Sequence, residues 1–322
     1  MLRDVFLFLS ESRLARRIAT DAPFADLVAR RFVAGETLDD ATRTVRSINE
    51  DGMHVTLDYL GESVRSREEA VAAANVYVEM IERIDAEKLD SNVSLKLTQM
   101  GQDIDEAFLR ENVGRVLDAA RERDLFVRFD MESSAYTQRT IDFFRSVWEE
   151  GYRNTGVVLQ SYLYRSEADV RQMNELGARV RLCKGAYKEP ESVAFPDKRD
   201  VDANFVRLMK LLLSEGNYPG IATHDEAMIR ATIDYARAEG IPASRFEFQM
   251  LYGVRRDLQQ QITRDGWNLR VYVPFGEAWY PYYMRRLAER PANVMFIMDA
   301  LVRESPLGSL VGNKNGRKNG RK

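Results

Sequence analysis

Eight short apolar segments recur along this chain of 322 residues, and a segment with helical spacing of apolar residues follows each of them. The intervening segments, such as residues 67–88, 104–123 and 201–213, are rich in Ala, Leu, Glu and Arg and predict amphipathic helices. Eight alternations of strand and helix over about 250 residues are typical of an α/β fold, the (β/α)8 or TIM barrel. The predicted strands are residues 54–61, 93–100, 125–131, 156–163, 178–183, 220–224, 246–251 and 269–274.

The chain divides into three predicted parts. Residues 1–50 carry only helical patterns, including one at 38–51, so we expect a helical arm before the barrel. Residues 51–305 are expected to form the barrel itself. The rest, residues 306–322, ends in a repeat of Asn, Gly, Arg and Lys and is expected to be a tail without fixed structure.

A doubly wound open sheet is the alternative arrangement of the same alternating elements. Such a sheet usually has a Gly-rich turn after its first strand. Here Gly61-Glu-Ser follows the first predicted strand, and the sequence contains neither GxGxxG at this place nor a Walker phosphate loop. The barrel is therefore the favoured prediction.

Charge and cysteine content exclude several classes of function. The net charge is −3, and the last nine residues carry five positive charges, which leaves −8 for the rest of the chain. A nucleic-acid partner therefore lacks electrostatic support. The single cysteine, Cys183, excludes an internal disulfide framework, and two histidines are too few for a typical His-rich zinc site. These counts lead us to expect no metal site. Because the sequence has no apolar run of about 18 residues and no signal-peptide pattern, we also expect a soluble cytoplasmic protein.

Polar residues occupy the face of the predicted strands that a barrel usually fills with Val, Ile and Leu. Side chains alternate along a strand, so Lys96 lies opposite its neighbouring leucines and Asp130 lies opposite Phe129. If the apolar face packs on the helices, the polar face points into the barrel, where unpaired charges would cost several kcal/mol each. We therefore expect a large polar ligand in the centre, although snorkelling at a barrel end is the alternative for single residues. The other residues on this face are Ser94, Thr98, Arg128, Gln160, Arg181, His224, Gln249 and Tyr272.

Two strand ends carry further candidates. The fifth strand ends in Arg181-Leu-Cys-Lys184-Gly, which is either a cradle for a phosphate or an electron-rich ring, or a solvated loop. The sixth strand ends in Thr223 and His224, and His224 is either a ligand contact or a satisfied core histidine. Asp225, the next residue, is a candidate helix cap.

Two adjacent arginines, Arg285 and Arg286, follow the last predicted strand, with Tyr282 one helical turn upstream of Arg285. Adjacent guanidiniums diverge by about 100° around a helix, so they share a ligand only when it lies over their common edge. The pair could clamp a small carboxylate, and the alternative is a solvated helix with an Arg285–Glu289 pair. The polar face of the strands favours the carboxylate clamp.

Seven short motifs occur in a fixed order along the predicted barrel. They are Ser-Leu-Lys-Leu at 94–97, Phe-Asp at 129–130, Val-Arg-Leu-Cys-Lys-Gly-Ala-Tyr at 180–187, Ala-Thr-His at 222–224, Phe-Glu-Phe-Gln-Met-Leu-Tyr-Gly at 246–253, Arg-Val-Tyr-Val-Pro-Phe-Gly at 270–276 and Tyr-Tyr-Met-Arg-Arg-Leu-Ala-Glu at 282–289. In this order, over residues 50–305, the chain resembles the proline dehydrogenase family, the flavin-dependent proline oxidases that occur alone or within bifunctional proline utilization proteins. Its length and layout are similar to those of the compact single-function bacterial members.

The resemblance implies a distorted (β/α)8 barrel that binds FAD noncovalently over its C-terminal mouth. It assigns binding of the proline carboxylate to Lys96, Arg285 and Arg286. Tyr272 and Tyr282 are implied to shape the pocket around the proline ring.

The resemblance also implies roles in catalysis and flavin binding. Asp130 and Arg181 are the implied catalytic residues: Asp130 helps to set the protonation of the site, and Arg181 lies near the hydride-accepting nitrogen of the flavin. Glu289 is implied to orient Arg286. Lys188 stands where the long bifunctional members have tryptophan, so the following loop is expected to differ in its flavin contacts. The residues implied to form the cofactor site are Met131, Gln160, Arg181, Lys184, Gly185, Ala186, Tyr187, Thr223, His224, Gln249 and Glu289.

The implied reaction is the oxidation of L-proline to pyrroline-5-carboxylate, the first step of proline catabolism to glutamate. A hydride would pass to FAD and the electrons to membrane quinone, with peripheral contact at the inner face of the membrane through the apolar residues 5–9. A Schiff-base lyase on the same barrel, with Lys96 or Lys184 as the nucleophile, is the alternative. A binding scaffold without enzymatic activity is a more distant one.

Overall fold

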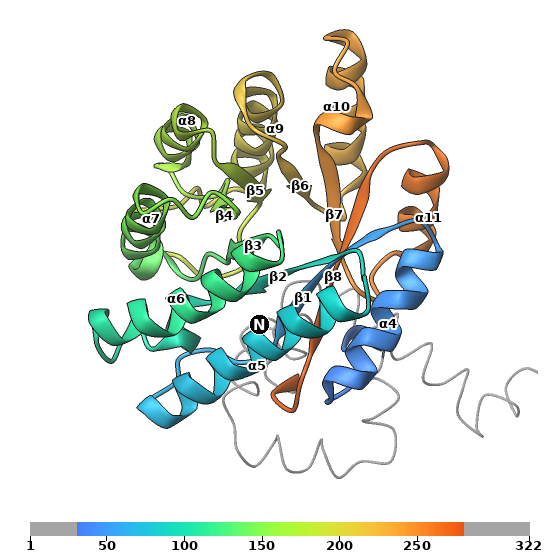
Figure 1. Ribbon diagram of the computed structural model, residues 1–322. Helices are drawn as coiled ribbons and strands as arrows, with labels where there is room; N and C mark the ends of the chain where they lie inside the picture. The colour runs from blue at the N-terminus through green and yellow to red at the C-terminus, as the bar shows by residue number, and fades with distance from the viewer. Residues whose placement is uncertain (1–30, 280–322) are drawn as a thin grey trace, which may run out of the picture. The chain divides into compact units, whose positions relative to one another are not determined.

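The computed structural model describes residues 31–279, and within them eight parallel strands form a closed barrel (Figure 1). The strands follow one another around the barrel in chain order, and the last one pairs with the first. The predicted (β/α)8 fold is therefore confirmed. The strands are β1 (His54–Tyr59), β2 (Ser91–Leu95), β3 (Val127–Phe129), β4 (Thr155–Gln160), β5 (Arg179–Cys183), β6 (Gly220–Ala222), β7 (Glu247–Leu251) and β8 (Leu269–Phe275).

Helices follow the strands and surround the barrel on the outside (Figure 1). Several begin at a side chain that accepts a hydrogen bond from the first turn, such as Ser66 from Glu69 N and Asp105 from Phe108 N. A cap of this kind contributes about 1 kcal/mol to helix stability. None of the helices in residues 31–279 is long and apolar enough to span a membrane. The helices are α5 (Arg67–Ala86), α6 (Glu106–Glu122), α7 (Ser134–Glu149), α8 (Ser166–Leu176), α9 (Lys198–Glu215), α10 (Glu226–Ala238) and α11 (Arg256–Arg264), with a short 3-10 helix, η2 (Ala243–Arg245), before β7.

The main hydrophobic core lies between the strands and the surrounding helices. Phe129 of β3, for example, is fully buried and packs edge-on against Phe143 and Phe144 of α7. Since alternate residues face opposite sides of a strand, the partners of these core residues along each strand face the inside of the barrel. The core residues of the strands include Val55, Leu57, Val93, Leu95, Val127, Val157, Leu159, Val180, Leu182, Phe248, Val271 and Val273.

One helix of the predicted arm packs directly on the barrel. This helix, α4 (Leu38–Glu50), lies against β1 and β8 and buries Ala41 and Val45 completely. The backbone just before it is tied to the end of β8, because Ala34 N donates to Pro274 O at 2.8 Å. Residues 31–50 thus belong to the same compact unit as the barrel, which runs from residue 31 to 277.

The second strand ends earlier than its sequence predicts. Its apolar pattern runs to Met100, but β2 ends at Leu95 and residues 97–100 form the 3-10 helix η1 (Leu97–Met100). Leu97 and Met100 are both fully buried, and Gly101, with a φ of 100°, ends the turn in the left-handed region. The alternation of Val93, Leu95 and Leu97 therefore looks like a continuing strand in the sequence, whereas the i,i+3 spacing of Leu97 and Met100 fits one 3-10 turn. The other predicted strands end within three residues of the observed ones.

Candidate active site

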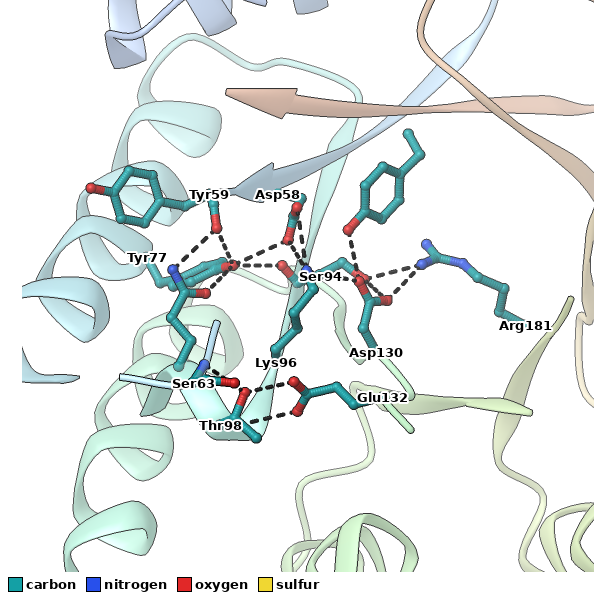
Figure 2. Close-up of polar contacts among 12 residues, drawn as sticks. Asp58, Tyr59, Ser63, Tyr77, Ser94, Lys96, Thr98, Asp130, Glu132 and Arg181 are labelled. Carbon is teal, nitrogen blue, oxygen red and sulfur yellow. Dashed lines mark hydrogen bonds and ion pairs between the residues drawn. The ribbon is translucent and has the colours of Figure 1, made fainter. Parts of the chain in front are cut away.

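Four charged side chains of alternating sign form a row at the mouth of the barrel, where the parallel strands end (Figure 2). The row consists of Asp58 on β1, Lys96 just after β2, Asp130 just after β3 and Arg181 on β5. Lys96 Nζ lies 3.2 Å from Asp58 Oδ1 and 3.7 Å from Asp130 Oδ2, and Arg181 Nη1 lies 2.8 Å from Asp130 Oδ1. Each charge has a neighbour of opposite sign, which offsets the cost of burying it. We call these four residues the charge row.

Asp130 is the acceptor at the centre of the charge row. Besides Arg181 and Lys96, it accepts hydrogen bonds of 2.7 Å from Ser94 Oγ and from Tyr272 OH. Burial by itself would raise the pKa of Asp130, but the adjacent Arg181 and Lys96 charges outweigh it and hold this pKa below its usual value. Asp130 is therefore a carboxylate that fixes the Tyr272 hydroxyl and the Arg181 guanidinium in place.

The two residues at the other end of the row have opposite pKa shifts. Asp58 is completely buried, and burial raises its pKa from 3.8 to about 6 in spite of the Lys96 charge beside it. For Lys96, burial would lower the pKa, but the carboxylates of Asp58 and Asp130 raise it above its usual value. A Schiff-base nucleophile needs a neutral amine. The surroundings of Lys96 thus argue against the lyase alternative at this residue.

Arg181 has one guanidinium nitrogen left for a ligand. Its Nε donates to Gln249 Oε1, its Nη1 donates to Asp130 and to Ser94 Oγ at 3.2 Å, and its guanidinium lies 5.1 Å from the ring centre of Tyr272. Its Nη2 is buried and finds no hydrogen-bond partner within residues 31–279. Gln160, at the end of β4, is in the same state, since its Nε2 donates to Glu132 O but its buried Oε1 has no partner in the described part of the chain. Leaving such buried groups unpaired costs about 1–3 kcal/mol each, so a polar ligand that reached both atoms would be stabilised by them.

Glu247, two residues before Gln249 on β7, holds the Gln249 amide in the orientation that lets it accept from Arg181. Gln249 Nε2 donates to Glu247 Oε1 at 2.6 Å, so its Oε1 is left to accept from Arg181. Glu247 in turn forms an ion pair with Arg270 at 2.7 Å. A side chain at Gly220 would collide with the Gln249 amide, so only glycine leaves this amide in place.

The loops after β5 and β6 bring together the remaining cofactor candidates. Lys184 forms ion pairs with Asp202 of α9 and, at 2.7 Å, with Asp225. Asp225 also caps α10 by accepting from Ala227 N, which confirms the cap prediction. His224 Nε2 accepts a hydrogen bond of 2.9 Å from Leu251 N, so this nitrogen carries no proton.

Gly185 begins the loop after β5 in a conformation that suits glycine. Its φ is 112°, and an added Cβ would lie 2.5 Å from the ring of Tyr162. The backbone at Gly185 therefore lies directly against the Tyr162 ring, and a larger residue at this position would not fit without a shift of that ring.

Asp58 and Glu132 also belong to this region, and neither is among the residues predicted from the sequence. Glu132 accepts from Thr98 Oγ1 at 2.6 Å and from Thr98 N at 3.3 Å, and burial raises its pKa (Figure 2). The signal for Asp58 is the alternation of β1, where His54, Thr56 and Asp58 share the face opposite Val55 and Leu57. Glu132 has no such signal, because it follows β3 in a loop.

The structure describes most of the residues that the sequence predicts for the site, and it brings several of them together. It brings Lys96, Asp130, Arg181 and Tyr272 into direct contact or hydrogen bonding with one another. Gln160 is buried at the end of β4, and Gln249 is buried in the middle of β7. Met131 and Thr223 are buried as well, each just past a strand. The predicted residues that lie outside the described part of the chain are Tyr282, Arg285, Arg286 and Glu289.

Known proteins are similar to this chain both in sequence and in fold. The chain is 43% identical to Proline dehydrogenase 1 of Bacillus subtilis (strain 168) over 304 residues, which cover 94% of this chain and all of the relative. It is 41% identical to the proline dehydrogenase of Deinococcus radiodurans over 280 residues, or 86% of this chain and 90% of the relative. Among solved structures, it is similar to proline utilization A (PutA) from Bdellovibrio bacteriovorus inactivated by N-propargylglycine, with a TM-score of 0.79 and 28% identity. That match covers 92% of this chain and 36% of the longer protein.

The family assignment rests on most of the sequence and on the fold together. The sequence model of the family described as proline dehydrogenase matches residues 41–299, which include the whole barrel from β1 to β8. The relatives of similar length are matched over nearly their full extent. The chain belongs to the proline dehydrogenase family.

Proposed function

We infer that this protein oxidises L-proline to pyrroline-5-carboxylate, with FAD as the hydride acceptor. Proline loses a hydride from the ring carbon next to nitrogen and a proton from the nitrogen, which leaves the C=N bond of the product. FAD, when bound, supplies the hydride-accepting ring. The membership of the chain in the proline dehydrogenase family supports proline as the substrate.

The observation that carries the flavin proposal is the pair of unpaired polar atoms at the barrel mouth. Arg181 Nη2 is a donor and Gln160 Oε1 an acceptor, both are buried, and neither has a partner in residues 31–279. A flavin ring system presents both acceptors and a donor along its edge, so it can satisfy the two together. We propose the same cofactor site as above, formed by Met131, Gln160, Arg181, Lys184, Gly185, Ala186, Tyr187, Thr223, His224 and Gln249, with Glu289 beyond the described residues.

For the substrate, we propose that Lys96 binds the proline carboxylate together with Arg285 and Arg286. The charge row has no net charge when both of its carboxylates are ionised, so Lys96 alone gives little excess of positive charge. Two further arginines would provide that excess, and a guanidinium fork matches a carboxylate well. Tyr272 and Tyr282 are proposed to bound the proline ring.

Within the site, the described residues have distinct proposed tasks. Lys96 would orient the substrate, and fixing a substrate against its reaction partner is a large entropic contribution to catalysis. Asp130 would hold the Tyr272 hydroxyl, whose oxygen lies 2.7 Å from Asp130 Oδ2. Arg181 would place positive charge where negative charge develops during hydride transfer.

An absorbance spectrum of the purified protein tests substrate and cofactor together. We expect a visible flavin band that bleaches when L-proline is added without oxygen, and no bleaching with cyclopentanecarboxylate, which lacks the ring nitrogen. A protein that binds no FAD, or whose flavin is not reduced by L-proline, would contradict the proposal. Trapping with borohydride and a keto substrate would instead reveal the lyase alternative.

We further propose quinone as the electron acceptor, with the protein in the cytoplasm and in peripheral contact with the inner face of the membrane. This proposal rests on the family resemblance and on the apolar residues 5–9, which lie outside the described part of the chain. Turnover that depends on a soluble quinone analogue and is faster with it than with oxygen would support it. Equal rates with and without the analogue would contradict it.

A further inference from the structure

The loops after β4 and β5 lie side by side over the barrel mouth as one paired unit. Leu163 and Ala194 form an antiparallel bridge, and around it Phe195 N donates to Tyr162 O at 2.8 Å and Tyr164 N to Val193 O at 3.1 Å. Tyr162, Leu163 and Ala194 form a small hydrophobic cluster of their own, separate from the main core. The loop that begins with Gly185 is thus attached to the β4 loop along several residues.

One carboxylate attaches this paired unit to a third loop. Glu189 Oε1 accepts from Ser134 N at 2.7 Å and from Tyr162 OH at 3.2 Å, and Glu189 Oε2 accepts from Ser134 Oγ. Ser134 is the first residue of α7, the helix that follows β3. Glu189 therefore connects the loops after β3, β4 and β5.

The contact replaces a local helix cap. Ser133, the N-cap residue of α7, makes no side-chain hydrogen bond to the first turn of its helix. Glu189, 55 residues after Ser134 in the chain, supplies that acceptor instead. A carboxylate at a helix N-terminus is also favoured by the helix dipole, so α7 and the β5 loop stabilise each other.

The three connected loops carry residues of the proposed flavin site. Asp130 and Met131 lie between β3 and α7, Gln160 lies at the end of β4, and residues 185–187 lie four to two positions before Glu189. From this geometry we propose that Glu189 is a positioning residue, which holds residues 185–187 in the place where they receive FAD. The proposal rests on the proposed flavin-dependent function.

Glutamate suits this task because all three groups that reach it are donors. A carboxylate accepts from all of them in charge-assisted hydrogen bonds, whereas a glutamine has a single acceptor oxygen and no charge, so its hydrogen bonds to these groups are weaker. In Glu189→Gln the β5 loop should leave its binding position for part of the time. If the competent fraction falls to about a tenth, the apparent Kd for FAD rises roughly tenfold.

The test compares FAD binding by the full-length protein and by two glutamate variants. Equilibrium dialysis against FAD should give a Kd about tenfold higher for Glu189→Gln than for the unaltered protein. The control is Glu191→Gln, because Glu191 is exposed and takes part in the paired unit through its backbone oxygen, which accepts from Tyr164 OH. The control should bind FAD like the unaltered protein, and the KM for proline at saturating FAD should be similar in all three.

A second variant keeps the test valid if Glu189→Gln does not fold. Tyr162→Phe keeps the ring beneath Gly185 and removes only the hydroxyl that donates to Glu189. It should weaken FAD binding by a smaller factor, and it should add little to the effect of Glu189→Gln in the double variant, since both act through one contact. FAD affinity unchanged in both variants, or fully additive losses, would overturn the role of Glu189. An unaltered protein that binds no FAD would instead overturn the proposed function.

Discussion

Asp58 sets the net charge of the charge row, which in the proposed function lies next to the substrate carboxylate. Its carboxyl group is completely buried and lies 3.2 Å from Lys96 Nζ. Burial raises its pKa to about 6, so it is neutral below that pH and ionised above it. The charge row therefore has a net charge near +1 below pH 6 and near zero above it.

The pKa values of the groups in direct contact with Asp58 are shifted away from this range. The pKa of Asp130 is lowered, in spite of its burial, by Arg181 and Lys96, and the pKa of Lys96 is raised by the carboxylates beside it. Burial raises the pKa values of the neighbouring Tyr77 and Tyr272 well above normal. Burial also raises the pKa of Glu132 nearby, so the Asp58→Asn variant is what assigns a change in carboxylate binding near pH 6 to Asp58.

We predict that binding of cyclopentanecarboxylate weakens about three- to tenfold between pH 5.5 and 7.5, since Asp58 gains a negative charge close to the ligand. In Asp58→Asn the affinity should stay at the low-pH level throughout, because asparagine cannot ionise. The inhibition constant against L-proline measures this at each pH. The same pH dependence in the protein and the variant would rule out Asp58 as its source.

At the scale of secondary structure, η1 shows how one turn sets the place of a functional side chain. Lys96 precedes this 3-10 helix, and its carbonyl oxygen accepts from Gln99 N at 3.1 Å. Gly101 ends the turn with a φ of 100°, and an added Cβ would lie 2.9 Å from the ring of Phe108. The conformation of Lys96 at the end of β2 thus depends on glycine at position 101.

Gly101→Ala is expected to destabilise the protein by at least about 1 kcal/mol, through backbone strain and the contact with Phe108. Gly114→Ala is the matched control, because Gly114 lies inside α6 and an added Cβ would meet nothing within 4 Å. That control should stabilise the protein by up to about 1 kcal/mol. Urea unfolding measures both variants, and a neutral Gly101→Ala would contradict this account of the turn.

At the scale of the whole barrel, charged side chains inside it stabilise the pairing of the last strand, β8, with the first, β1. Arg270 of β8 bonds both to Glu247 of β7 at 2.7 Å and to the carbonyl oxygen of Val55 on β1 at 2.7 Å. This contact connects three strands at the seam where the last strand meets the first. Burial would raise the pKa of Glu247, but Arg270 outweighs it and holds this pKa below its usual value.

A carboxyl group with a lowered pKa stabilises the fold above its unfolded pKa, and this contribution is lost as the pH falls through the folded value. Stability should therefore drop below about pH 4.5. Glu247→Gln should lower the free energy of unfolding by about 3–5 kcal/mol at pH 7, since it leaves a buried arginine unpaired, and should make the acid-induced loss smaller. Thermal unfolding from pH 3 to 7 measures both effects. Glu50→Gln, at an exposed position, is the control and should match the unaltered protein.

Local patterns in the sequence predict much of this fold. Apolar alternation places β1 through β8 to within a few residues, and the same alternation identifies Lys96, Asp130, Arg181 and Gln249 on the inner face. It fails at the end of β2, because Leu97 continues the alternation of Val93 and Leu95 although it is the first residue of a 3-10 turn. It could also have found Asp58, since the pattern of β1 is as regular as that of the other strands.

The sequence by itself determined the order of the elements, the polar inner face and the resemblance to a family, because these depend on short-range periodicity and on motifs. Only the tertiary structure decided which side chains meet: Tyr272 reaches Asp130 across 142 positions, and Glu189 caps α7 across 55. The raised pKa of Asp58 is likewise decided by the tertiary structure, since it depends on the complete burial of this side chain beside Lys96. Such contacts and shifts arise only when barrel closure brings distant strand ends together and excludes water from them.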